Sequence, residues 1–167
     1  MFLKISAGVL FVIGGFFCGL NLSDKLKRKV LFCRECEKML NVCEYMVRAS
    51  NSDVYGIVRH LKEENYSCLR FIYILPECYS PEDDFRQVWK NAVMSDRSFD
   101  MEEQEILNDI GELLGSTDIE GQLRGISDIR SVINSINAER IGVYRQKGRL
   151  YRSVGVLIGV TLGIMVI

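Results

Sequence analysis

Two stretches without a charged residue lie at the ends of the chain, over residues 5–23 and 153–167. A helix needs roughly 20 apolar residues to cross the hydrocarbon core of a bilayer, or somewhat fewer when flanking basic side chains reach back to the interface. The first stretch meets this length, whereas the second has 15 residues. We therefore predict an N-terminal transmembrane helix within residues 1–23 and a shorter C-terminal one over residues 153–167.

Basic residues flank both stretches on the side that faces the middle of the chain: Lys25, Lys27, Arg28, Lys29, Arg145, Lys147, Arg149 and Arg152. Because lysine and arginine beside a membrane segment are retained on the cytoplasmic side, residues 24–152 are expected to form a cytoplasmic domain. A cleaved signal peptide is the alternative for the first stretch. It is disfavoured because no A-x-A pattern follows the stretch and basic residues come next.

The middle region has the pattern of an all-helical domain. Apolar residues recur at three- and four-residue steps, and the chain contains only two prolines. We expect six helices: one over residues 24–49, one that begins near Val54, a short one over residues 67–75, and one after each of Ser80, Asp100 and Asp118. Nothing between residues 119 and 152 is typical of a helix end. The predicted fold is therefore all-α, a six-helix cytoplasmic bundle flanked by N- and C-terminal transmembrane helices.

Helix start signals support these boundaries. Ser80 can cap a helix that begins with a proline and has three acidic residues in its first turn, Glu82, Asp83 and Asp84. Asp100 and Glu103 form a capping box, and the helix that they open is expected to end at Gly115. Asp118 can cap the last helix, in which glycines at positions 121, 125, 142 and 148 cost about 1 kcal/mol each relative to alanine.

Charge is distributed unevenly along a chain whose net charge is −1. Residues 77–128 contain 14 acidic and 4 basic residues, a net charge of −10, whereas residues 129–152 contain 1 acidic and 6 basic residues, a net charge of +5. The overall balance argues against a nucleic-acid-binding protein. Acidic residues in first turns are usually partners of the helix dipole and less often metal ligands. An exposed acidic face would also attract a basic partner protein, with candidate contacts at Glu82, Asp83, Asp84, Glu102, Glu103 and Glu105.

Candidate catalytic chemistry is sparse. Cys33 and Cys36 form a C-x-x-C, but no second pair follows at zinc-site spacing, and His60 is the only histidine. Cysteines on one helical face are more often small buried apolar residues. No phosphate-binding glycine motif occurs. We therefore expect no catalytic residue, cofactor, metal or small-molecule substrate. A membrane-anchored metal- or redox-active protein that uses Cys33, Cys36 and His60 is the alternative.

Glycines recur at four-residue steps in both uncharged stretches, at Gly15 and Gly19 and at Gly155, Gly159 and Gly163. This spacing lets helix backbones approach closely, although glycine is also common in membrane helices. The pattern predicts that the two ends pack together or against another membrane protein.

A short motif in residues 110–122 resembles the stage III sporulation protein AB family of endospore-forming bacteria. That family has a Gly-x-x-Leu-Gly-x-x-Asp-x-x-x-Gln signature, matched here by Gly111, Leu114, Gly115, Asp118 and Gln122. The resemblance extends over the whole length, from the apolar N-terminal segment through an aromatic helix around Trp89 to the apolar C-terminal end. The cysteine-rich first helix departs from the family pattern.

The resemblance implies a component of the channel complex that joins mother cell and forespore, sited in the mother-cell membrane around the forespore. Its soluble domain would be similar to the helical-bundle domains of type II secretion and type IV pilus inner-membrane platform proteins. Such platforms have no catalytic residues and couple a secretion-type ATPase to the other membrane proteins of the complex. By the same resemblance, Gly111 and Gly115 would allow tight packing and a sharp turn, and Asp118 would cap the last helix. A membrane sensor or adaptor unrelated to sporulation is a further alternative.

Overall fold

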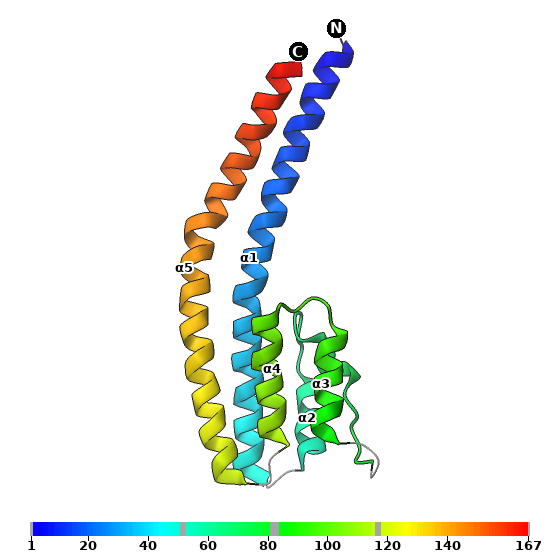
Figure 1. The fold of residues 1–167 in the computed structure, drawn as a ribbon, viewed down its shortest axis with the longest axis vertical. Helices are drawn as coiled ribbons and strands as arrows, with labels where there is room; N and C mark the ends of the chain where they lie inside the picture. The colour runs from blue at the N-terminus through cyan, green and yellow to red at the C-terminus, as the bar shows by residue number, and fades with distance from the viewer. Residues whose placement is uncertain (1, 51–52, 81–83, 116–117, 167) are drawn as a thin grey trace. The chain divides into compact units, whose positions relative to one another are not determined.

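The computed structural model describes residues 2–50, 53–80, 84–115 and 118–166. Its elements are α1 (Phe2–Ser50), α2 (Val54–Glu63), the 3-10 helix η1 (Arg70–Ile74), α3 (Phe85–Ser95), α4 (Met101–Leu114) and α5 (Ile119–Val166) (Figure 1). No strand occurs in these described ranges. The all-α prediction is therefore confirmed.

The first and last helices are long and continuous. α1 has 49 residues, so that the predicted N-terminal helix and the predicted first bundle helix form one element. α5 has 48 residues, in agreement with the lack of helix-ending residues between positions 119 and 152. The predicted transmembrane helices over residues 1–23 and 153–167 are not supported, because no helix in the described part of the chain is long and apolar enough to cross a membrane.

Two shorter helices differ from the prediction. The third is the 3-10 helix η1, which has only 5 residues. The fourth begins at Phe85 and not after Ser80, because Asp84 is its N-cap and accepts a hydrogen bond from the Arg86 N–H at 3.1 Å. Aspartate caps a helix as well as serine does. The predicted first turn at residues 81–83 lies outside the described residues.

The chain divides into two compact units, which we call the hairpin unit (Met1–Leu31 with Ile136–Ile167) and the bundle unit (Phe32–Ser135). In the hairpin unit, the N-terminal part of α1 and the C-terminal part of α5 run antiparallel, side by side (Figure 1). Arg140 Nη1 donates a hydrogen bond to the Lys29 carbonyl at 3.1 Å. Gly148 lies beside the buried Ser23, whose Oγ would be 3.6 Å from a Cβ at position 148.

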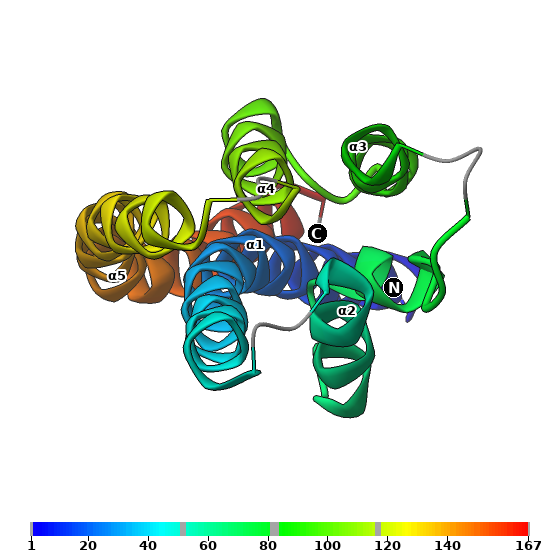
Figure 2. The same cartoon turned by 90° about the horizontal axis from the view of Figure 1, so that it is seen from below.

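Aromatic side chains from several elements form the core of the bundle unit. Seen end-on, the second half of α1 has α2, α4 and the start of α5 around it, and α3 lies beside α4 (Figure 2). Edge-to-face contacts join the ring centroids of Phe71 and Trp89 at 5.2 Å, of Phe71 and Phe99 at 6.0 Å, and of Phe32 and Phe99 at 5.8 Å. Each such pair contributes about 0.5–1.5 kcal/mol beyond the burial of its area. The core therefore ties α1, η1, α3 and the α3–α4 connection together.

A buried carboxylate holds the segment between α2 and η1. Glu35 in α1 is 8% exposed, and its side chain accepts hydrogen bonds from three consecutive backbone N–H groups, those of Ser67 at 2.8 Å, Cys68 at 2.7 Å and Leu69 at 3.2 Å. Without this partner the buried N–H groups of Cys68 and Leu69 would be left unsatisfied. Glu35 thereby fixes the start of η1 and the position of Phe71 in the core.

Candidate functional site

The five signature residues lie where α4 ends and α5 begins, and α3 packs against this region. Gly111 lies directly under the Trp89 indole, since a Cβ at position 111 would be 2.6 Å from Trp89 Cγ. The indole Nε1 donates a hydrogen bond to the Leu107 carbonyl at 2.7 Å, one helical turn before Gly111. Both contacts place the five-membered ring of the indole against α4. Tight helix packing at Gly111, as the resemblance implies, is confirmed.

Gly115 makes room for Arg86 of α3. A Cβ at position 115 would lie 2.7 Å from Arg86 Cγ, and Arg86 Nη2 donates a hydrogen bond to the Gly115 carbonyl at 3.2 Å. The backbone of Gly115 has φ −76° and ψ 1°, a conformation that any residue can adopt. The turn at Gly115 therefore does not itself depend on glycine, and the absence of a side chain there leaves room for Arg86.

The remaining signature residues cap the two helices that meet at the corner. Asp118 Oδ2 accepts a hydrogen bond from the Gly121 N–H at 3.0 Å, which confirms the predicted N-cap of α5. Gln122 is 9% exposed and donates from Nε2 to the Leu114 carbonyl at 3.3 Å. That carbonyl stands in the last turn of α4, where no intrahelical donor is available. The signature thus builds the corner between α4 and α5.

Gly125 brings α5 close to α4, although sequence reasoning treated it only as a weak point in a helix. A Cβ at position 125 would lie 3.1 Å from Leu113 Cδ2. A side chain there would require the Leu113 side chain to move. The sequence signal that could have shown this is the four-residue step from Gly121 to Gly125 on one helical face.

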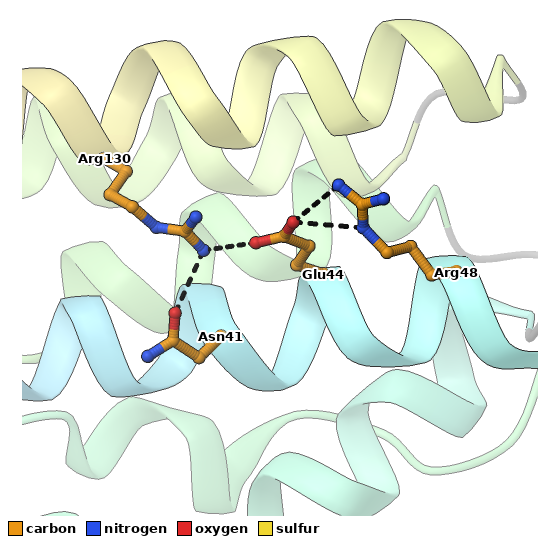
Figure 3. Close-up of polar contacts among 4 residues, drawn as sticks. All are labelled: Asn41, Glu44, Arg48 and Arg130. Carbon is orange, nitrogen blue, oxygen red and sulfur yellow. Dashed lines mark hydrogen bonds and ion pairs between the residues drawn. The ribbon is translucent and has the colours of Figure 1, made fainter.

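An ion-pair cluster joins α5 to α1 within the bundle unit (Figure 3). Arg130 Nη2 donates to Glu44 Oε2 at 2.5 Å and to Asn41 Oδ1 at 3.0 Å. Arg48 donates to Glu44 Oε1 at 2.8 Å from Nη2 and at 3.1 Å from Nε. The hydrogen bonds from Arg130 and then Arg48 hold the pKa of Glu44 below its ordinary value. Sequence reasoning missed this cluster, whose α1 members stand at helical steps of three and four residues.

The candidate acidic contacts occupy different environments. Asp84 is exposed and caps α3, and Glu102 and Glu105 are exposed on α4. Glu103 is fully buried and completes the confirmed capping box with Asp100. The Glu103 N–H donates to Asp100 Oδ1 at 2.9 Å, and the Asp100 N–H donates to Glu103 Oε2 at 3.4 Å. Glu103 is therefore unavailable to a partner, which corrects that part of the prediction. The candidates Glu82 and Asp83 lie outside the described residues.

The exposed acidic surface continues along α4 beyond the predicted residues. Glu102, Glu105, Asp109 and Glu112 follow one another at steps of three and four residues and are all exposed; we call them the acidic stripe. Burial raises the pKa of Asp109, and the neighbouring carboxylates of Glu105 and Glu112 raise it further. Sequence reasoning stopped at the first turn of this helix and so missed the last two members.

The structure does not support the metal or redox alternative. Cys33 and Cys36 are buried at 1% and 0% exposure, whereas the His60 side chain is 51% exposed and its Nδ1 lies 3.0 Å from Glu63 Oε2. In the described residues, no group of three or more His, Cys, Asp or Glu side chains could hold a metal ion. Burial raises the pKa of Cys43 to about 12, so that this thiol stays protonated. These cysteines pack as small apolar residues.

The glycines of the two apolar ends are described only in part. Gly15 is half-buried and Gly19 is buried in the N-terminal part of α1. Gly155, Gly159 and Gly163 belong to α5, but their surroundings lie outside what the structure describes. Packing of the two ends through these glycines stays a prediction.

Fold and corner together define an all-helical protein whose signature residues serve packing and capping. The chain belongs to the stage III sporulation protein AB family, whose model matches residues 4–167. Neither a curated protein nor a solved structure matches the chain. Family membership gives the protein a role in sporulation, and the family is not a known family of enzymes.

Proposed function

We propose that this protein is a non-enzymatic scaffold of the channel complex between mother cell and forespore, held at the mother-cell membrane that surrounds the forespore. In this proposal, the bundle unit couples a cytoplasmic secretion-type ATPase to the other membrane proteins of the complex. Family membership supports the link to sporulation. The uncharged ends and their basic flanks support attachment to a membrane.

The observation that carries the ATPase contact is the acidic stripe on α4. α4 is held from the α3 side by Trp89 and Arg86, and Gln122 of α5 binds the carbonyl of its last residue, Leu114. The stripe is therefore displayed from a helix whose position is fixed. Carboxylates on such a helix steer a basic partner toward the surface and favour one orientation of it. An ATPase with a complementary basic surface is the partner that we propose.

Charge reversal in the middle of the stripe tests this contact. We expect the full-length variant Glu105→Lys/Asp109→Lys to capture at least ten-fold less ATPase from sporulating cells than the unchanged chain, because like charges then face each other at the interface. The matched control is Glu63→Lys/Asp128→Lys, which changes the net charge equally at two exposed acidic positions outside the stripe. We expect this control to capture the normal amount of ATPase.

Thermal unfolding followed by circular dichroism shows whether the stripe variant is folded. Normal capture by a folded stripe variant would count against α4 as the contact. An equal loss in the control variant would show that only the overall charge matters, and the proposed surface would be wrong.

A further inference from the structure

The basic residues of the two helices in the hairpin unit lie at one level. The Arg140–Lys29 hydrogen bond and the contact between Gly148 and Ser23 fix the alignment of the two antiparallel segments. Positions 24–28 of α1 and 141–147 of α5 lie between these two contacts. Each segment has exposed basic side chains there, Lys25 and Lys27 on α1 and Arg145 and Lys147 on α5. We call these four residues the cationic belt.

Few acidic residues offset this charge. The hairpin unit contains ten lysines and arginines and only two acidic residues, Asp24 and Glu139, a net charge of +8. Both acidic residues are exposed, and each is next to a basic residue in the sequence. The belt thus concentrates positive charge from two segments that are more than 100 positions apart in the sequence.

On the side of the belt toward the chain ends, the hairpin unit exposes apolar side chains. On α1, Leu10 is 69% and Ile13 46% exposed, and on α5 Leu157 is 64% and Ile164 70% exposed. Because the two segments run antiparallel, these apolar residues of both segments lie on the same side of the belt. The hairpin unit therefore has exposed apolar side chains on one side of the cationic belt.

We propose that the hairpin unit binds an anionic phospholipid surface, with its apolar side chains in the acyl region and the cationic belt against the phosphate headgroups. This arrangement matches the border of a bilayer, where apolar chains adjoin negative charge. A second copy of this chain fits less well, because a parallel copy at the same level would place belt against belt. The inference rests on the membrane attachment in the proposed function, but it names the lipid chemistry and does not involve the ATPase.

Flotation with lipid vesicles tests the proposal on the purified full-length chain. Vesicles of phosphatidylcholine alone are compared with vesicles in which part of this lipid is replaced by phosphatidylglycerol. We expect tighter binding to the second kind, and binding that weakens as salt is added. The variant Lys25→Gln/Lys27→Gln/Arg145→Gln/Lys147→Gln should lose this preference, by about five-fold for each cationic side chain removed.

The matched control removes four exposed basic side chains from the bundle unit, in the variant Arg59→Gln/Lys90→Gln/Arg97→Gln/Arg124→Gln. It should keep the full preference for phosphatidylglycerol. Equal binding of the unchanged chain to both vesicles would overturn the proposal, and so would an equal loss in the control variant. Self-association of the chain without vesicle binding would instead assign the apolar surface to contacts between copies. ATPase capture is measured on the belt variant as well. Normal capture by this variant would show that the lipid proposal can fail while the ATPase contact stays intact.

Discussion

The bundle unit and the hairpin unit differ in both core and charge. In the described part of the chain, all buried hydrophobic side chains except Val30 belong to the bundle unit. The bundle unit has 11 basic and 20 acidic residues, a net charge of −9, whereas the hairpin unit has a net charge of +8. The bundle unit is therefore held by its own core. The hairpin unit exposes many of its described apolar side chains and depends more on what covers them.

The comparison is tested most strongly by removing Trp89, which is fully buried and contacts Phe71 and Phe85 with ring centroids 5.2 and 5.7 Å apart. Trp89→Ala should lower the free energy of unfolding of the bundle unit by about 3–5 kcal/mol, because it leaves a large cavity. Leu157→Ala in the hairpin unit should change it by less than about 0.5 kcal/mol, since this side chain is 64% exposed. Urea unfolding followed by circular dichroism measures both. Similar losses in the two variants would refute the contrast.

Glycine substitutions should have opposite signs in the two units. Gly111→Ala places a methyl group against the Trp89 indole and should cost about 1–3 kcal/mol of stability. A Cβ at position 142 would have no atom within 4 Å, so Gly142→Ala should stabilise α5 by about 0.5–1 kcal/mol. Thermal unfolding of the two variants gives the signs directly. A stabilising alanine at position 111 would show that the indole does not lie against α4.

Two carboxylates of the bundle unit should respond to pH in opposite ways. The pKa of Glu44 is lowered, so its ion pairs stabilise the fold above the unfolded-state pKa of about 4.3 and are lost as the pH falls through the lower folded-state value. The pKa of Asp109 is raised, so its charge destabilises the fold at neutral pH, and protonation relieves this as the pH falls.

At neutral pH, Glu44→Gln should therefore lose about 0.5–1 kcal/mol, and Asp109→Asn should gain about 0.2–0.5 kcal/mol. Urea midpoints at neutral and acidic pH measure both effects, and both differences should shrink in acid. If the urea midpoints of both variants moved in the same direction at neutral pH, the lowered pKa of Glu44 and the raised pKa of Asp109 could not both be right.

Local rules predicted much of the fold from the sequence. The capping box at Asp100 and the N-cap at Asp118 involve neighbours within three residues, and their hydrogen bonds occur as expected. Cysteines on one helical face were expected to be small buried apolar residues, and Cys33, Cys36 and Cys43 of α1 are buried. Such features depend on the helix period and on short-range hydrogen bonds alone.

The features that the sequence did not reveal join distant positions. Glu35 binds backbone N–H groups 32 to 34 residues away, and Arg130 binds Glu44 across 86 residues. The need for glycine at position 111 comes from an indole 22 positions earlier, which no local rule contains. The start of α3 was misplaced because two good caps, Ser80 and Asp84, stand close together. Tertiary packing decides such cases.

Crosslinking from the acidic stripe in sporulating cells tests the central claim most directly. A photo-crosslinking residue replaces Glu105 in one full-length variant and Asp128, an exposed acidic residue of α5, in another. We predict a crosslink to the secretion-type ATPase from position 105 and none from position 128. A crosslink from position 128 alone, or no ATPase crosslink from position 105 in a functional variant, would contradict the account.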